Sequence, residues 1–228
     1  MKRCLTVINV NNVLCPNAAQ SFAHAANRWD AEFTTITACN PDYHPTYCKH
    51  LCGKDLFAEC AQLLISDADI LIRSDAPNPF DLFNDPEKYY AVSNSQAHYF
   101  TQEQHSIEDE ALVRWQGKLP LNFTRTHAHM VNTGFCLFKP ETMRPTSDRF
   151  RSLLQGLQKD WRSHPHVEQF LWNCVLYEQN VPIHFLDETW NRLRPEYTVS
   201  MNRYVYHFTG YNVTPNFRAA IKTYNWRV

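Results

Sequence analysis

Two aspartates close an apolar segment near the middle of the first half of the chain. Residues 62–65 are largely apolar, and Asp67-Ala68-Asp69 follow almost at once. Two carboxylates this close together in a semi-buried setting carry a large desolvation cost unless a cation balances them. Carboxylate oxygens are the ligands that Mg²⁺ and Mn²⁺ prefer. The triplet therefore suits a Mn²⁺ or Mg²⁺ site, but taken alone it is more typical of a solvated turn capped by Asp67.

Three other short motifs place polar groups beside apolar segments. In chain order they are Asn132-Thr133-Gly134, Glu168-Gln169 and Tyr206-His207. A glycine lets a ligand approach the backbone closely. A carboxylate at the start of a helix suits either a ligand or the helix dipole, and an imidazole either binds a metal or makes a hydrogen bond within the core. Taken one at a time, the motifs at residues 132–134 and 206–207 are more typical of ordinary structure than of a functional site, and Glu168-Gln169 suits either.

Alternating strand and helix patterns position the aspartates. Strands are expected at residues 4–9, 32–37 and 62–65, and helices at residues 17–29 and 46–59. The order β-α-β-α-β predicts a parallel sheet covered by helices. Ligands of such sheets bind beyond the carboxyl ends of the strands, and Asp67 lies at one of these ends.

The second half of the chain has a mixed pattern. Further strands are expected at residues 89–92, 134–138, 182–186 and 203–208, and helices at residues 146–160, 166–178 and 215–223. Residues 103–130 are polar and predict loops with one helix near 106–115. Together with the first half, this indicates an α/β protein whose second part is mixed.

Glycine content and charge exclude several classes of protein. Only five of the 228 residues are glycine, and none have the spacing of the glycine-rich loops that hold phosphates. The net charge of −1 argues against a nucleic-acid-binding protein. No apolar run approaches the length of about 18 residues expected of a transmembrane helix. If this protein binds a nucleotide, a cation must take the place of the glycine loop.

Eight cysteines lie singly along the chain. Cys4, Cys60, Cys136 and Cys174 have apolar neighbours, and we expect reduced core thiols and a cytoplasmic location. A denser cluster comprises Cys39, His44, Cys48, His50 and Cys52. Its spacing is not that of a standard zinc site, so we favour incidental thiols there over a zinc-stabilised interaction domain.

The ordered set of motifs resembles the GT-A glycosyltransferases, in particular glycogenin-like and related bacterial or viral members. The matching stretches are residues 63–72, Asn132-Thr133-Gly134-Phe135, residues 168–173, Leu186-Asp187 with Trp190-Asn191, and His207-Phe208-Thr209-Gly210. The resemblance spans roughly residues 4–210.

This resemblance implies a fold and an activity. The fold would be a single GT-A domain over residues 1–228, with a Rossmann-like, mostly parallel central sheet, flanking helices and a smaller mixed part on the acceptor side. Residues 1–100 would form the nucleotide-sugar-binding half, and residues 101–228 the acceptor and sugar-pocket half. The activity would be metal-dependent transfer of a sugar from a nucleoside-diphosphate sugar, with a UDP-sugar as the expected donor, to a hydroxyl of a glycan, a protein or a small molecule.

The resemblance also implies roles for particular residues. Asp69 and His207 would bind the metal, and Asp67 would bind the metal or the donor ribose. The other donor-binding candidates are Val10, Asn11 and Asn12 at the base, Asn132, Thr133 and Gly134 in the sugar pocket, and Gln169 and Gly210 nearby. Arg73, Lys49 and Lys222 are the basic candidates for the diphosphate. If the reaction inverts configuration, the acceptor needs a general base, for which Glu168 and Asp187 are the acidic candidates.

The sequence departs from the family after the histidine. Tyr211-Asn212-Val213 stand where glycogenin-like members have Lys-Pro-Trp, and Glu168 replaces the usual aspartate of an Asp-Gln pair. Two alternatives therefore stay open: a non-catalytic nucleotide- or glycan-binding module on the same scaffold, and a sugar-phosphate nucleotidyltransferase, which would normally carry a glycine-rich loop.

Overall fold

The central element of the fold is a six-stranded mixed sheet, seen here in a computed structural model. Its strand order is β2-β1-β3-β6-β5-β7. The strands are β1 (Arg3–Ile8), β2 (Glu32–Ile36), β3 (Gln62–Asp67), β5 (Tyr89–Ser93), β6 (Val131–Phe138) and β7 (Ile183–Leu186). The structure describes residues 2–14, 16–51, 60–93, 130–157, 165–193 and 203–208. The predictions at Cys52, residues 103–129, Gly210 and residues 215–223, which include Lys222, lie outside this part of the chain.

Most neighbouring strands of this sheet are parallel. β1 pairs in parallel with β2 and with β3, and β5 pairs in parallel with β7. β6 is antiparallel to both of its neighbours, β3 and β5. The predicted α/β class with a mostly parallel sheet is therefore confirmed.

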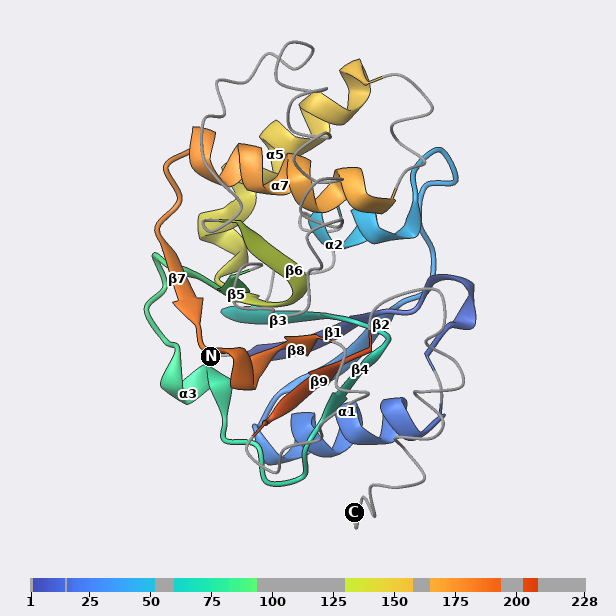
Figure 1. Ribbon diagram of the computed structural model, residues 1–228, viewed down its shortest axis with the longest axis vertical. Helices are drawn as coiled ribbons and strands as arrows, with labels where there is room; N and C mark the ends of the chain where they lie inside the picture. The colour runs from blue at the N-terminus through green and yellow to red at the C-terminus, as the bar shows by residue number, and fades with distance from the viewer. Residues whose placement is uncertain are drawn as a thin grey trace.

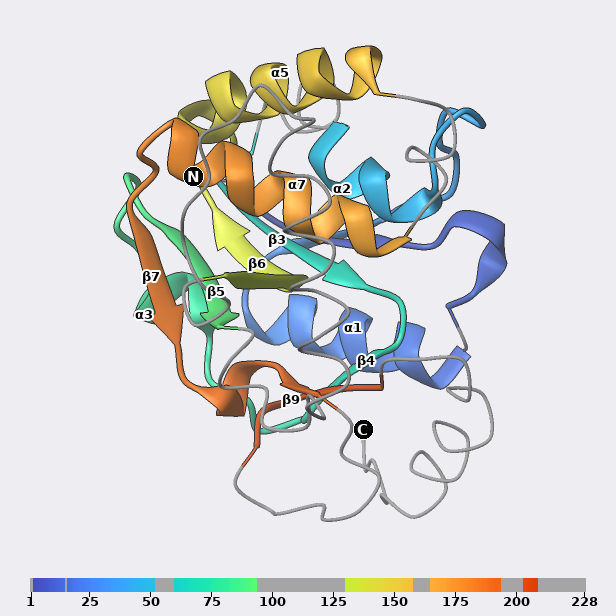
Figure 2. The same cartoon turned by 45° about the horizontal axis from the view of Figure 1, so that its top comes forward.

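Helices and a second sheet cover the two faces (Figures 1 and 2). The helices α2 (Cys48–Leu51), α5 (Pro140–Gly156) and α7 (Pro165–Glu178) lie on one face. The opposite face carries α1 (Pro16–Arg28) and a small sheet of order β4-β9-β8, made of β4 (Ile70–Ile72), β9 (Val205–His207) and β8 (Arg192–Leu193). The short helix α3 (Pro79–Leu82) begins after Asn78, whose side chain accepts from the N–H of Phe80 at 3.0 Å.

The apolar strands reflect this three-layer arrangement. Successive side chains of a strand point to opposite faces, so Cys4 and Ile8 join the core under α5 and α7. Leu5 and Val7 join the core under α1 and the small sheet. A strand buried on both faces is largely apolar at successive positions, which is why residues 4–8, apart from Thr6, and residues 63–65 show no alternation.

The sequence of α1 shows the single apolar stripe of a helix that covers a sheet. Its buried residues Ala18, Phe22, Ala25 and Ala26 recur at intervals of three and four. The other expected helix of the first half begins instead as a 3-10 turn, η2 (Pro45–Tyr47), and continues as α2 to Leu51. This order places Lys49 and His50 on a short helix directly over the sheet.

Four cysteines correct the prediction of reduced thiols. Disulfides join Cys4 to Cys60 and Cys39 to Cys48, with Cα–Cα distances of 6.1 and 5.9 Å. Cys4 and Cys60 meet because β1 and β3 start side by side, a proximity that depends on strand pairing and not on sequence spacing. The Cys39–Cys48 bond removes two thiolates from the proposed zinc cluster. The expected cytoplasmic location rested on reduced cysteines, and the two disulfides remove that support.

Two cysteines match the prediction. Cys136 and Cys174 are buried and free. Burial raises the pKa of the Cys136 thiol to about 12, so this group stays protonated and unreactive at neutral pH.

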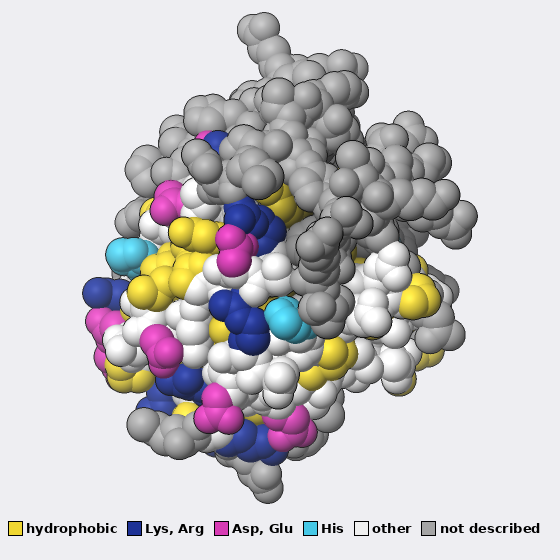
Figure 3. Space-filling model, turned by 90° about the horizontal axis from the view of Figure 1, so that it is seen from below, with side chains coloured by type: hydrophobic (Ala, Val, Ile, Leu, Met, Phe, Trp, Pro, Cys, Tyr) yellow, Lys and Arg dark blue, Asp and Glu magenta, His cyan; other side chains and the backbone are white. Residues whose placement is uncertain are grey.

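The surface carries both signs of charge. On the face drawn in Figure 3, Lys and Arg side chains are interspersed with Asp and Glu, and neither sign forms a broad field. Within the described ranges, no helix combines the length and apolar character needed to cross a bilayer.

Candidate metal and donor site

Three ligand-type side chains converge beyond the carboxyl end of β3. Asp67 ends β3, Asp69 lies in the turn that leads to β4, and His207 ends β9. Their ligand atoms all lie within 4.8 Å of one another. His207 Nε2 is 3.2 Å from Asp69 Oδ1 and 3.8 Å from Asp67 Oδ2. We call these three residues the acidic cluster.

The spacing within the acidic cluster suits a single hard cation. Neighbouring ligands of an octahedral Mg²⁺ lie about 3 Å apart and opposite ligands about 4 Å apart, given metal–oxygen bonds of about 2.1 Å. The Asp67 and Asp69 side chains retain 25% and 30% exposure, whereas His207 is almost fully buried at 3%. The predicted metal ligands therefore fit a divalent cation in chemistry and in separation.

Strand pairing brings residues about 140 positions apart into this cluster. β4 pairs with β9 in antiparallel fashion, and Ile70 lies opposite His207. The backbone N–H of Phe208 donates to the carbonyl of Asp69 at 2.9 Å. The turn that carries Asp69 is thus held directly beside the histidine.

Gly134 provides the space that the imidazole occupies. A Cβ at this position would stand 2.7 Å from His207 Nδ1 and 3.0 Å from Asp67 Oδ2. Real Cβ atoms essentially never show a contact under 3.0 Å, so the imidazole would have to move, and the Asp67 carboxylate would have to give slightly. The glycine predicted in the sugar pocket is therefore also required by the packing of two predicted metal ligands.

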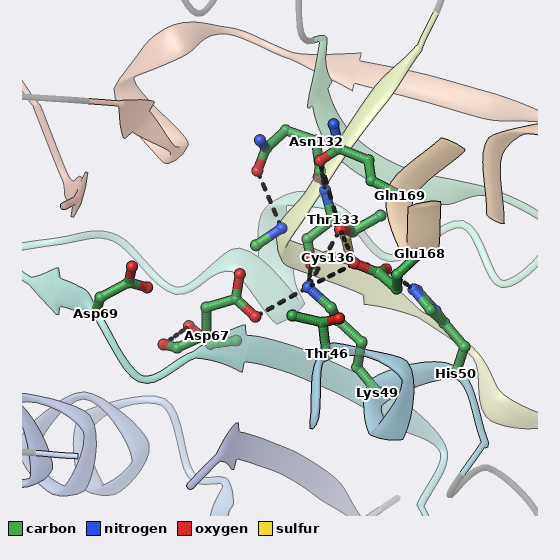
Figure 4. Close-up of polar contacts among 12 residues, drawn as sticks. Thr46, Lys49, His50, Asp67, Asp69, Asn132, Thr133, Cys136, Glu168 and Gln169 are labelled. Atoms are coloured by element: carbon green, nitrogen blue, oxygen red, sulfur yellow. Dashed lines mark hydrogen bonds and ion pairs between the residues drawn. The ribbon is translucent and has the colours of Figure 1, made fainter. Parts of the chain in front are cut away.

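A second group of charges lies on the other side of Asp67 (Figure 4). Lys49 Nζ donates to Asp67 Oδ1 at 2.9 Å and lies 3.6 Å from Glu168 Oε2. Glu168 also accepts a hydrogen bond from His50 Nε2. The side chains of Lys49, His50 and Glu168 are each only 2–3% exposed. We call these three residues the buried cluster.

Thr133 connects the buried cluster to β6 and α7. Lys49 donates to the carbonyl of Thr133 at 3.3 Å and to its hydroxyl at 3.2 Å. The backbone N–H of Thr133 donates to Gln169 Oε1 at 3.1 Å. The motifs at residues 132–134 and 168–169 therefore meet.

Burial and charge act in opposite directions within the buried cluster. Burial by itself would lower the pKa of Lys49, but the carboxylates of Asp67 and Glu168 raise it above its ordinary value. Burial lowers the pKa of His50 despite the opposing effect of Glu168. Lys49 is therefore a permanent cation at neutral pH, and His50 is a neutral donor to Glu168.

The predicted base-binding segment follows β1. Ile8 pairs with Asp67, so the parallel strands β1 and β3 end at the same edge of the sheet. Val10, Asn11 and Asn12 form the 3-10 turn η1 at this edge, where Asn11 has a positive φ of 66°. Asparagine tolerates this left-handed conformation better than most residues.

The other charged candidates have local partners. Arg73 forms an ion pair with Asp75 and donates to the carbonyl of Arg203 at 3.2 Å. Asp187 is exposed and caps the 3-10 turn η5 (Glu188–Trp190) by accepting from the N–H of Thr189 at 2.8 Å. Among the described basic candidates, Lys49 is the one in contact with Asp67.

The sequence did not predict that two further residues, His50 and Asn191, contact the residues of this site. His50 entered only as part of the zinc alternative, yet it bonds to Glu168 and stacks on Trp172 with ring centroids 4.0 Å apart. Asn191 entered only as part of a family phrase, yet its Oδ1 lies 2.9 Å from His207 Nδ1. The basic pair Lys49-His50 was the available signal for His50, whereas Asn191 offered none.

Comparisons with known proteins support the fold. No protein-family model matches the chain, and its sequence matches no curated protein. Its structure resembles that of a glycosyltransferase involved in the glycosylation of the major capsid of PBCV-1, with a TM-score of 0.61, 12% identity and coverage of 97% of this chain and 100% of the other. It also resembles the galactosyltransferase LgtC solved with donor and acceptor sugar analogs, with a TM-score of 0.55, 12% identity and coverage of 99% and 96%.

A third similar structure is larger than this chain. The bifunctional glycosyltransferase WbbM matches with a TM-score of 0.64 and 12% identity over 99% of this chain, which spans 50% of WbbM. These similarities show that the chain has the GT-A fold of glycosyltransferases, as the ordered motifs predicted.

Proposed function

We propose that this protein is a metal-dependent glycosyltransferase. It transfers a sugar from a nucleoside-diphosphate sugar, with a UDP-sugar as the expected donor, to a hydroxyl of a glycan, a protein or a small molecule. The observation that carries this proposal is the acidic cluster at the carboxyl end of β3 in a GT-A fold. In open α/β sheets this edge is where ligands bind.

Asp67, Asp69 and His207 are the residues proposed to hold Mn²⁺ or Mg²⁺. Bound there, such a cation supplies Lewis-acid stabilisation for the negative charge of a departing diphosphate. Asp67 presents Oδ2 to this position while its Oδ1 accepts from Lys49. Lys49 thereby orients the Asp67 carboxylate.

The remaining donor contacts stay predictions. We propose that Val10, Asn11 and Asn12 line the base, and that Asn132, Thr133, Gly134 and Gln169 line the sugar pocket, with Gly210 and Arg73 as further candidates. Support for the first group is its position after β1, beside the end of β3. The division into a donor half (residues 1–100) and an acceptor half (residues 101–228) also remains a prediction.

Deprotonation of the acceptor depends on stereochemistry. In an inverting reaction we propose Glu168 or Asp187 as the base. Glu168 is held by two basic side chains in the buried cluster, and Asp187 is exposed. In a retaining reaction the departing phosphate can take the proton, and no carboxylate is needed. The anomeric configuration of the product, read by NMR, distinguishes the two.

The test is a thermal-shift screen of nucleotide sugars with and without Mn²⁺, followed by an assay for sugar release or transfer. We expect one donor to raise Tm only when Mn²⁺ is present, and the same donor to be turned over. A Mn²⁺-dependent shift without turnover would indicate a binding module instead. No shift with any donor would contradict the proposal.

A further inference from the structure

A chain of hydrogen bonds runs from the backbone of β6 to His207. The N–H of Gly134 donates to Asn132 Oδ1 at 3.0 Å. The same oxygen accepts from Asn191 Nδ2 at 2.8 Å, and Asn191 Oδ1 lies 2.9 Å from His207 Nδ1. Both asparagines are buried, at 6% and 0% exposure. We call this chain the asparagine relay.

The backbone N–H of Gly134 determines which atom donates and which accepts at every later step of the relay. A backbone N–H can only donate, so the Asn132 atom that faces Gly134 must be the carbonyl oxygen. That oxygen can only accept, so Asn191 must turn its NH₂ group toward it. The remaining Asn191 atom is then its oxygen, which faces His207 and requires a proton on Nδ1.

A proton on Nδ1 has a direct consequence for the opposite ring nitrogen. In a neutral imidazole only one nitrogen carries a proton, so Nε2 keeps its lone pair. Nε2 is the atom directed at Asp69 Oδ1 and Asp67 Oδ2. Without the relay, Nε2 would be expected to carry the proton, because Asp69 Oδ1 at 3.2 Å is an acceptor. A protonated Nε2 cannot bind a metal.

The relay begins at an irregularity in the sheet. β5 and β6 are in register at Ala91–Cys136 and again at Ser93–Val131, so two steps along β5 match five along β6. Residues 132–134 therefore bulge out of the β5–β6 ladder, which leaves the Gly134 N–H available to Asn132.

We infer that Asn191 and Asn132 are positioning residues that fix the Nδ1-protonated tautomer of His207 and thereby keep Nε2 ready for a cation. This inference rests on the proposed function for the identity of the ligand, but the tautomer itself is a property of the metal-free protein. Removing a hydrogen-bond partner behind a metal-binding histidine typically lowers metal affinity about 10–100-fold.

The first test needs no variant. Long-range ¹H–¹⁵N correlation spectra of the ¹⁵N-histidine-labelled, metal-free protein, recorded at a pH where the ring is neutral, distinguish the two tautomers of His207. The signals are assigned by their loss in His207→Gln. We expect the Nδ1-protonated pattern. An Nε2-protonated ring would overturn the inference.

The second test compares three variants. Asn191→Leu should switch His207 to the Nε2-protonated form and weaken Mn²⁺ binding about 10–100-fold in calorimetry. Asn191→Asp loses the donor to Asn132 Oδ1 but keeps an acceptor opposite Nδ1, so it should retain the proton on Nδ1. Asn173→Leu is the matched control, since Asn173 is equally buried but bonds the backbone of Val131 and Gln169. It should lower stability and leave the tautomer unchanged.

The outcomes separate this inference from the proposed function. If the parent binds Mn²⁺ and Asn191→Leu keeps both the tautomer and the affinity, the relay has no positioning role while the metal site stands. If the parent shows the Nδ1-protonated ring but binds no Mn²⁺, the metal assignment fails and the tautomer inference stands.

Discussion

The acidic cluster and the buried cluster meet at Asp67 but differ in charge and in access to solvent. The acidic cluster combines two partly exposed carboxylates with one imidazole and contains no lysine or arginine. In the buried cluster, Lys49 and His50 surround Glu168 at 2–3% exposure. The first cluster leaves its two carboxylates partly exposed, whereas the charged groups of the second pair with one another away from solvent. Asp67 Oδ1 accepts from Lys49 of the buried cluster, and Asp67 Oδ2 faces His207 of the acidic cluster.

Breaking the buried cluster should have the largest effect on stability. Lys49→Met removes the cation that compensates Asp67 and Glu168, and breaking a buried pair costs about 3–5 kcal/mol. Urea unfolding measures this loss. Lys88→Met is the matched control, because Lys88 forms an exposed pair with Asp85 at 3.1 Å. Exposed pairs contribute about 0–1 kcal/mol. Equal losses in the two variants would contradict the distinction between the clusters.

Breaking the acidic cluster should affect binding instead of folding. Asp69→Ala removes a ligand-type carboxylate without leaving a buried charge, so we expect Mn²⁺ affinity to fall by more than about 100-fold, beyond the loss typical of a residue behind a ligand. Calorimetric titration measures the affinity, and circular dichroism checks the fold. Asp75→Ala, which removes only the exposed partner of Arg73, should bind Mn²⁺ as the parent does. An unchanged Mn²⁺ affinity in Asp69→Ala would show that the acidic cluster is not the metal site.

Crowding the boundary between the clusters should have an intermediate effect. Gly134→Ala introduces a methyl group against His207 and Asp67, so both must shift. We expect Mn²⁺ affinity to fall at least about 10-fold, as for loss of ligand orientation. Gly156→Ala, where an added Cβ meets nothing within 4 Å, controls for the substitution itself. Parent affinity in Gly134→Ala would show that the imidazole can be displaced without loss of binding.

The smallest expected effect is the contribution of His50 to the pH dependence of the free energy of unfolding. Burial lowers its pKa in the folded protein below the value of about 6.5 for an unfolded chain. As pH falls below about 6.5, the unfolded state takes up a proton that the folded state does not, so stability decreases on acidification, by at most about 1.4 kcal/mol per pH unit.

Urea unfolding of the parent and His50→Gln at pH 8 and pH 5.5 tests this effect. The parent should lose more stability between the two pH values than the variant does. His184→Gln, at an exposed position on β7, should behave as the parent. Parallel pH curves for the parent and His50→Gln would rule out a buried neutral histidine.

The sequence was sufficient for the fold class and for the acidic cluster. The apolar segments and the Asp67-Ala68-Asp69 triplet are local patterns, and ordered motifs supplied the distant partner His207. The buried cluster could be predicted only in part, because Lys49 was one of three basic candidates and nothing in the local sequence indicates which of them is buried. The Cys4–Cys60 bond and the asparagine relay could not be predicted from the sequence, since both depend on strand register.

The pairing of β6 with β5 is irregular at the residues that carry the relay. A regular β5–β6 ladder would satisfy more backbone groups within the sheet, yet it would remove the bulge at residues 132–134. The backbone itself therefore departs from a regular sheet at the residues that we propose to line the sugar pocket. Deleting residues 132–134 would restore the β5–β6 register, but it would remove the Asn132 oxygen on which the relay is built and the Thr133 contacts of Lys49.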